Sequence, residues 1–167
     1  MKKIIIIAGL LISLLIVWNG KATAAEIQTK ENSILLFSQK EKQDDGYVII
    51  ETYEKTNESN VSLLSNSYSK HGERIVTKYD TKDKVQWIYV LSAEYWIEEG
   101  DSVICYKADY STTIKNSLWK FSEGSTSYSG NEAYGKGKFT YKVLWLFSVQ
   151  NTYIDIHLAC DAYGNLS

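Results

Sequence analysis

The clearest pattern along the chain is a strict alternation of apolar and polar positions near its C-terminal end. Between Phe139 and Val149 every second residue is Phe, Tyr, Val or Trp, and a second alternating run covers Thr152–Asp161. A period of two held over this length is typical of strands that bury one face. With Asn151 opening the turn between them, the two runs are predicted to form a hairpin in the core of the fold.

Shorter strand-like runs precede this hairpin and are separated by polar turns, of which Asp45-Gly46 is the strongest hairpin signal. They cover residues 33–38, 47–53, 73–79, 85–95 and 102–110, with a short apolar stretch at 117–122. The run 85–95 has apolar residues on both faces, which favours a central strand. In the run 102–110, Ile104, Tyr106, Ala108 and Tyr110 are expected to share one face.

The segment Gly124–Gly137 is rich in Ser, Gly and Tyr and is predicted to be a long loop. No period of 3.6 residues follows the N-terminal segment, and the chain contains no proline, so its turns depend on Gly, Asn, Asp and Ser. The pattern therefore predicts an all-β fold, an antiparallel β-sandwich or open barrel.

The first 24 residues differ from the rest and read as a signal peptide. Two lysines precede the apolar run Ile4–Val17, and Ala22-Thr23-Ala24 supplies small residues for cleavage. The run has the length of a signal peptide and is shorter than the 18 or so residues of a membrane span. We expect a helical signal segment cleaved after Ala24, followed by one secreted domain at 25–167. An uncleaved signal anchor is the alternative.

Cleavage changes the charge of the protein. It removes three of the 18 basic residues and none of the 20 acidic ones, which leaves a mature charge of −5. This balance argues against a nucleic-acid partner, whose phosphates call for a basic face. The later sequence contains no apolar stretch long enough for a membrane span, so none is expected after cleavage.

Cys105 and Cys160 are the only cysteines, and both remain in the mature chain. An even number of cysteines in an exported protein favours a disulfide. A bridge between Cys105 and Cys160 is therefore predicted, with two buried free thiols as the alternative.

The aromatic content points to binding more than to catalysis. The chain contains 13 Tyr and 5 Trp, and four of these rings are placed near turns or in the predicted loop. Such rings near a surface stack on sugars or anchor a protein partner, although rings also close the ends of a sandwich core. The candidate binding residues are Trp96, Trp119, Tyr128 and Tyr134.

Catalytic signals are sparse. His157 and Asp155 share a strand face, but no third ligand is placed by spacing, so no metal site is predicted. Neighbouring acids occur at Asp44-Asp45 and Glu98-Glu99, and acids in turns are normally solvated. No motif for a catalytic residue or a cofactor is found, so none is predicted.

Four C-terminal stretches carry a resemblance to known sequences: Tyr110–Asn116, Leu118–Lys120, Ala133–Val143 and Ala159–Leu166. They resemble small secreted proteins of Gram-positive bacteria that are grouped as an uncharacterised domain-of-unknown-function family. The resemblance covers about the last 60 residues. It implies a compact extracellular β domain and assigns no activity.

Together these observations predict a secreted interaction domain at the cell surface or wall, with a protein or glycan partner. The alternative is a small secreted hydrolase with an unrecognised pair of acids. A large exposed apolar patch would favour a protein partner. A flat row of exposed Trp and Tyr would favour a glycan, and acids gathered in a concave pocket would favour an enzyme.

Overall fold

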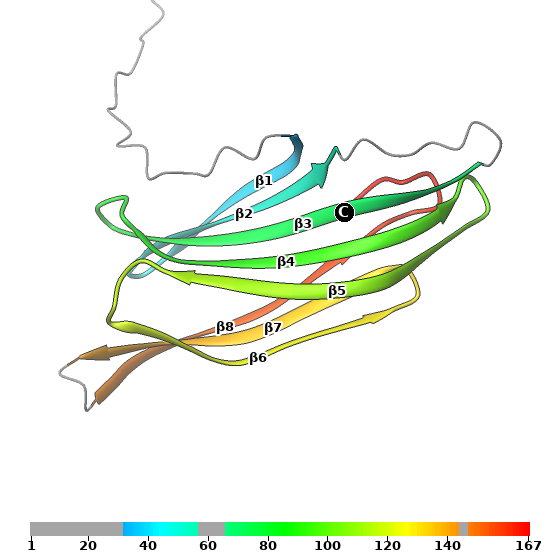
Figure 1. Cartoon of the computed structure of the whole chain (residues 1–167). Helices are drawn as coiled ribbons and strands as arrows, with labels where there is room; N and C mark the ends of the chain where they lie inside the picture. Colours follow the sequence, from blue (N-terminus) through cyan, green and yellow to red (C-terminus); the bar gives the residue numbers. More distant parts are fainter. Residues whose placement is uncertain (1–31, 57–65, 144–146) are drawn as a thin grey trace, which may run out of the picture.

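The computed structural model describes residues 32–56, 66–143 and 147–167, which form eight strands and no helix (Figure 1). The fold is all-β, as predicted. The strands are β1 Ser33–Gln43, β2 Gly46–Lys55, β3 Ser67–Asp80, β4 Val85–Glu98, β5 Ser102–Ile114, β6 Trp119–Ser129, β7 Glu132–Val143 and β8 Phe147–Ala159.

The strands form two antiparallel sheets that face each other as a β-sandwich (Figure 1). One sheet has five strands in the order β1-β2-β3-β4-β5, and the other has three in the order β6-β7-β8. Every pairing joins neighbours in sequence, as expected for a meander built from hairpins. The strand β4 lies inside the larger sheet, which confirms its predicted central position.

The inner faces of the sheets share an aromatic core. Trp87, Tyr89 and Leu91 on β4 are fully buried, and Ile88 and Val90 cover the opposite face of the same strand. The ring of Trp87 stacks on Phe139 of β7, with 4.0 Å between the ring centroids. The alternating apolar residues that predicted these strands are thus the ones that pack between the two sheets.

The two long sides of the sandwich are closed in different ways. On the β5 side, the backbone N–H of Cys105 donates to the carbonyl of Gly130 in the turn between β6 and β7, at 2.7 Å. On the other side, β3 reaches the second sheet with charged side chains. Arg74 donates to the His157 carbonyl of β8 at 2.6 Å, and Lys70 donates to the Gly164 carbonyl. The strands β1 and β2 lie beyond these contacts (Figure 1).

Two sequence predictions about turns are wrong. The segment 124–137 is a hairpin and not a loop: β6 and β7 pair along it, with the turn at Gly130 and Asn131. Asn151 forms no turn, because it lies within β8 and pairs with Thr140. β7 instead ends at Val143, which pairs with Phe147, and residues 144–146 between them lie outside the described residues.

Both edge strands of the five-stranded sheet contain a β-bulge. Leu36 is the extra residue in β1, because Leu35 pairs with Tyr53 and Phe37 pairs with Thr52. Tyr106 is the extra residue in β5, opposite the junction of Glu94 and Tyr95. Each bulge changes which side chains share a face, and this corrects the prediction for residues 104–110.

The predicted signal peptide and its helix, at 1–24, lie outside the described residues. Within the part of the chain that the structure describes, no helix is long and apolar enough to cross a membrane.

Candidate functional site

The four predicted binding aromatics do not form one surface. Trp119 is only 3% exposed, and its ring packs edge-on against Trp87 in the core. Trp96 is exposed on the outer face of the five-stranded sheet, whereas Tyr128 and Tyr134 belong to strands of the other sheet. The Tyr134 hydroxyl donates to Glu132. The structure therefore leaves Trp96 and Tyr128 as exposed rings on different sheets and makes Trp119 a core residue.

The predicted disulfide is absent, since Cys105 and Cys160 are both free, buried thiols. Each thiol donates to a nearby carbonyl: Cys105 to that of Lys107 and Cys160 to that of Asp161. Burial raises the pKa of both thiols, that of Cys160 to about 11. The thiols are therefore protonated at neutral pH, which is the unreactive form. Cysteine number alone gave the wrong pairing because it carries no information on geometry.

Asp155 and His157 lie on the outer face of the three-stranded sheet without forming a metal site. The Asp155 carboxylate pairs with Lys136 at 3.4 Å, and the His157 ring lies 6.5 Å from the ring of Tyr134, centroid to centroid. Among the described residues, no three His, Cys, Asp or Glu side chains are close enough together to hold a metal ion.

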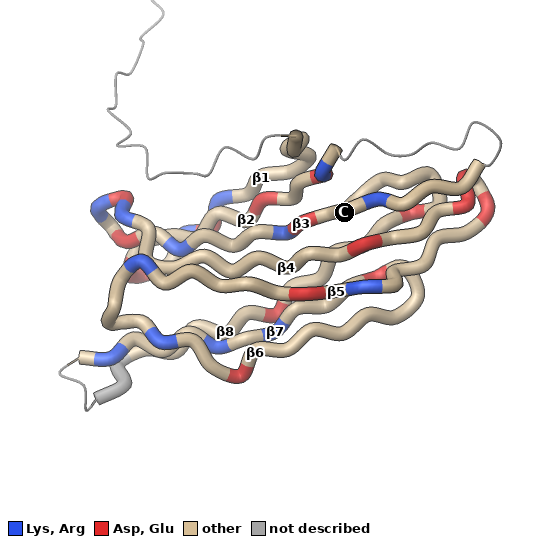
Figure 2. Tube along the Cα trace, in the orientation of Figure 1, with Lys and Arg blue, Asp and Glu red and all other residues tan. Residues whose placement is uncertain are grey.

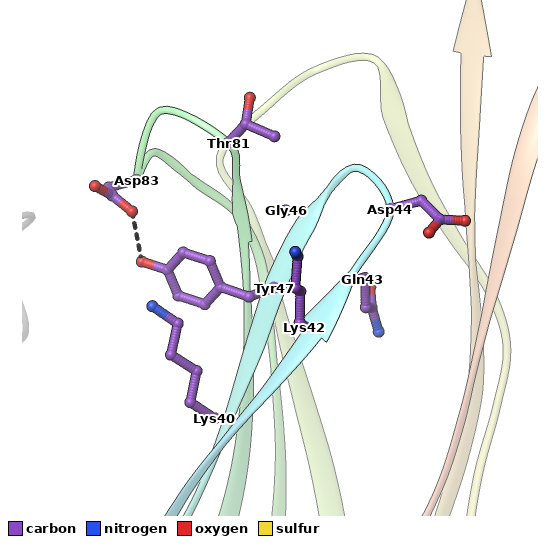
Figure 3. Close-up of a pocket in the computed structure, with 8 residues that line it drawn as sticks. All are labelled: Lys40, Lys42, Gln43, Asp44, Gly46, Tyr47, Thr81 and Asp83. Carbon is purple, nitrogen blue, oxygen red and sulfur yellow. Dashed lines mark hydrogen bonds between the residues drawn. The ribbon is translucent and has the colours of Figure 1, made fainter.

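A polar depression of about 560 Å³ lies where the β1–β2 and β3–β4 turns meet (Figure 3). Its floor is Tyr47, whose ring stacks on Tyr79 and lies 3.6 Å below the Lys40 ammonium. The Tyr47 hydroxyl donates to Asp83 at 2.9 Å. Burial, and then this bond, raise the pKa of Tyr47 to about 12, so the phenol stays protonated and is a poor general base.

The neighbouring acids Asp44 and Asp45 border this depression but are not arranged for hydrolysis. Asp44 lines the depression, whereas Asp45 accepts a 2.5 Å bond from the fully buried ammonium of Lys78. Gln43 accepts a second bond from Lys78. Since Asp45 neutralises a buried cation, its role is structural, and the pair does not supply two carboxyls to one substrate.

The most unusual surface lies on β1. Ile34, Leu35, Leu36 and Phe37 are 51%, 49%, 43% and 47% exposed, four large apolar side chains in a row. We call these four residues the β1 apolar segment. Their strand is the outer edge of the larger sheet and pairs only with β2. By register, Ile34 and Phe37 point to the inner face, and Leu35 points to the outer face beside Tyr53.

The sequence placed a strand at 33–38 but did not mark it as a binding site. A run of apolar residues on both faces is normally a sign of a buried central strand. Only the strand order, which places β1 at an edge, shows that the run is exposed. The charged residues that follow, Lys40–Lys42, are the one local sign of an edge.

Comparisons of the chain with protein-family models, with curated proteins and with solved structures find no match.

Proposed function

We propose that this protein is an exported interaction domain that binds a protein partner through the β1 apolar segment. The observation that carries the proposal is the exposure of Ile34–Phe37, from 43% to 51%, on an edge strand. Single exposed apolar residues are common on soluble proteins, whereas contiguous ones mark interaction sites.

The geometry of the segment favours a partner that covers both of its faces. Successive side chains of a strand point to opposite sides, so one flat surface buries only half of the segment. The bulge at Leu36 interrupts the regular edge, which disfavours simple addition of a partner strand. A groove that receives the side chains of Phe37 and Leu35 on opposite walls fits this arrangement.

Export is supported by the sequence pattern of residues 1–24. The β1 apolar segment begins ten residues after the predicted cleavage site at Ala24, so it would lie near the N-terminus of the mature protein. A glycan partner is less well supported than a protein, because of the four candidate rings Trp119 is buried, and the exposed rings of Trp96 and Tyr128 belong to different sheets. The hydrolase alternative is less well supported, because the depression between the β1–β2 and β3–β4 turns contains no convergent pair of acids.

The proposal is tested by placing the photocrosslinking residue p-benzoylphenylalanine at position 36 of the full chain and irradiating the producing cells. A discrete crosslinked protein is expected from position 36. The matched control is position 111, an exposed serine on the edge strand β5.

The same experiment is repeated with Leu35→Ser and Phe37→Ser in the labelled chain, which should remove the crosslinked species while leaving the protein folded. Position 36 giving no product, or the same product as position 111, would count against the proposal. A crosslink to a second copy of the chain would identify the partner as the protein itself.

A further inference from the structure

A second exposed apolar surface lies on the outer face of the five-stranded sheet, near the turn between β4 and β5. Trp96 and Ile104 are directly opposite each other across these strands, and Tyr106 lies two residues further along β5. The three side chains are 43%, 53% and 42% exposed. We call them the β4–β5 patch.

Hydrogen bonds to Glu94 connect the two strands beside the patch. Because of the bulge in β5, both Tyr106 and Lys107 reach Glu94 on the neighbouring strand. The Tyr106 hydroxyl donates to one carboxylate oxygen of Glu94 at 2.9 Å, and Lys107 donates to the other at 2.8 Å. These two bonds, with that from Lys107 the stronger, lower the pKa of Glu94. The hydroxyl of Tyr106 is thereby bonded to Glu94, which lies two residues before Trp96 on β4.

Acidic side chains border the patch on the side of the turn. Glu98, Glu99 and Asp101 are all exposed there, and Figure 2 shows the acidic positions gathered at this end of the sheet. Within the described residues none of the three forms an ion pair with Lys or Arg. The lysines on this part of the outer face have other partners, since Lys107 binds Glu94 and Lys55 binds Glu73. Among the described residues, no basic side chain therefore pairs with the acids of this border.

We propose that the β4–β5 patch docks a basic segment of a partner protein, one that presents apolar side chains flanked by Lys or Arg. The composition favours a protein over a sugar because Ile104, the most exposed member, has no ring to stack on a pyranose. Trp and Tyr around an aliphatic residue, with polar groups at the margin, are typical of the centre of a protein interface. The acidic border selects a partner of opposite charge.

This inference does not rest on the function proposed for β1. The two surfaces lie at opposite edges of the same sheet, with β2 and β3 between them. At about 4.8 Å per strand, the separation is roughly 15–19 Å, so one site can be disabled without touching the other.

The test uses three synthetic peptides of equal length as probes: alternating Lys and Leu, alternating Glu and Leu, and alternating Lys and Ser. Each is titrated into ¹⁵N-labelled protein produced from the full chain, and the Trp96 indole N–H and the amides of Ile104 and Tyr106 are followed by NMR. We expect the Lys–Leu peptide to shift these signals and the Glu–Leu peptide to leave them unchanged. The Lys–Ser peptide should bind more weakly than the Lys–Leu peptide, because it lacks the apolar part.

Two variants separate the contributions of the patch and its border. Ile104→Thr, which keeps a β-branched residue in the strand, should weaken binding of the Lys–Leu peptide about tenfold. Glu98→Gln with Asp101→Asn should weaken it several-fold and reduce its sensitivity to NaCl, since screening acts on the charged border. An unchanged dispersion of amide signals elsewhere shows that each variant is folded.

The control is Leu35→Ser with Phe37→Ser in β1, which should bind the Lys–Leu peptide as the natural chain does. The inference is overturned if the Glu–Leu peptide binds equally well, if the shifts appear away from residues 94–107, or if both patch variants bind normally. If position 36 of the otherwise natural chain gives no crosslinked product while peptide binding at the β4–β5 patch is retained, only the proposed function is contradicted.

Discussion

The two edge strands of the five-stranded sheet differ in their contacts with the rest of the described structure. Both β1 and β5 are edge strands, both contain a bulge, and both expose large apolar side chains. β5 continues into the second sheet: its backbone bonds to the turn at Gly130, and Thr126 of β6 donates to the Ala108 carbonyl. β1 bonds to β2 and, among the described strands, pairs with no other.

The difference shows in how the exposed side chains are supported. Beside the patch on β5, Tyr106 and Lys107 share the carboxylate of Glu94. The β1 apolar segment contains no polar side chain that could anchor it in this way. Edge strands normally limit association by charge, bulges or cover. Among the described residues, β5 has cover and charge in addition to its bulge, whereas the N-terminal half of β1 has only its bulge.

The largest expected effect separates a core phenylalanine from one on the β1 edge. Phe139 is fully buried and stacked on Trp87, so Phe139→Ala should lower the free energy of unfolding by about 3–5 kcal/mol. Phe37→Ala removes the same atoms from a side chain 47% exposed and should change it by less than about 0.5 kcal/mol. Urea unfolding of the purified protein measures both values. Equal losses would mean that β1 is covered in the isolated protein.

The next effect concerns the side of the sandwich that is closed by charged side chains, where Arg74 joins β3 to β8. Its guanidinium donates to the His157 carbonyl and, at 3.1 Å, to the buried hydroxyl of Thr52. Arg74→Met should lower the free energy of unfolding by about 1.5–3 kcal/mol, because hydrogen bonds to a charged donor are lost. The substitution should also increase the rate of amide hydrogen exchange more in β8 than in β7.

The control for Arg74→Met is Lys107→Met on β5, the opposite edge of the sheet from β1. Lys107 is exposed, so loss of its ion pair with Glu94 should have little effect on stability, as is typical of surface pairs. If the two substitutions lower the free energy of unfolding equally, the charged side chains do not hold β3 and β8 together. Apolar contacts alone would then retain β8.

A smaller effect is expected from the close packing of β6 against β7. A Cβ added at Gly137 would lie 2.5 Å from the ring of Phe121, so Gly137→Ala should cost about 1–3 kcal/mol through overpacking. Gly130 has open space around it but a φ of +58°, so Gly130→Ala should cost about 1 kcal/mol through backbone strain. Phe121→Leu in the same chain should recover part of the loss for Gly137→Ala and none for Gly130→Ala, as measured by urea unfolding.

The sequence predicted the strands better than it predicted their connections. Apolar residues on both faces of the run 85–95 predicted a central strand, and β4 does lie inside the larger sheet, with Trp87 and Tyr89 buried on its inner face. The hairpin of β6 and β7 was not, because Gly135 and Gly137 resemble loop residues. In the structure they leave room for the rings of Tyr89 and Phe121, which belong to other strands.

The candidate surfaces were harder to predict than the fold. Trp96 and Trp119 were both placed near turns by the sequence pattern, yet one is exposed and the other is in the core. Exposure depends on which sheet covers which face, and this is set by contacts between distant strands. The bulge at Tyr106, which places Ala108 and Tyr110 on the opposite face of β5 from Ile104, leaves no local sign in the sequence. Nor does the edge position of β1, which turns an apparent core strand into an exposed one.

The smallest effect tests the outer face between the two edges through His71. Its Nε2 atom is buried and has no hydrogen-bond partner within the described residues. Lys55 on β2 and Glu94 on β4 flank it in the sheet, Glu73 lies 3.8 Å away, and Lys107 faces it from β5. Burial, and then the charge of Lys55, lower the pKa of His71 below its ordinary value of 6.5.

Because the folded state binds a proton at His71 less readily than the unfolded chain does, the histidine's contribution to stability is complete above pH 6.5. It is lost as the pH falls from 6.5 toward the lowered pKa of the folded state. The natural protein should therefore be less stable to urea at pH 5.5 than at pH 7.5, and His71→Gln should reduce this difference. Carboxylates such as Glu94, whose pKa is lowered from an ordinary value of 4.5, lose their contribution only at more acidic pH. An equal pH dependence in both proteins would place the effect elsewhere and show that the outer face tolerates a charged His71.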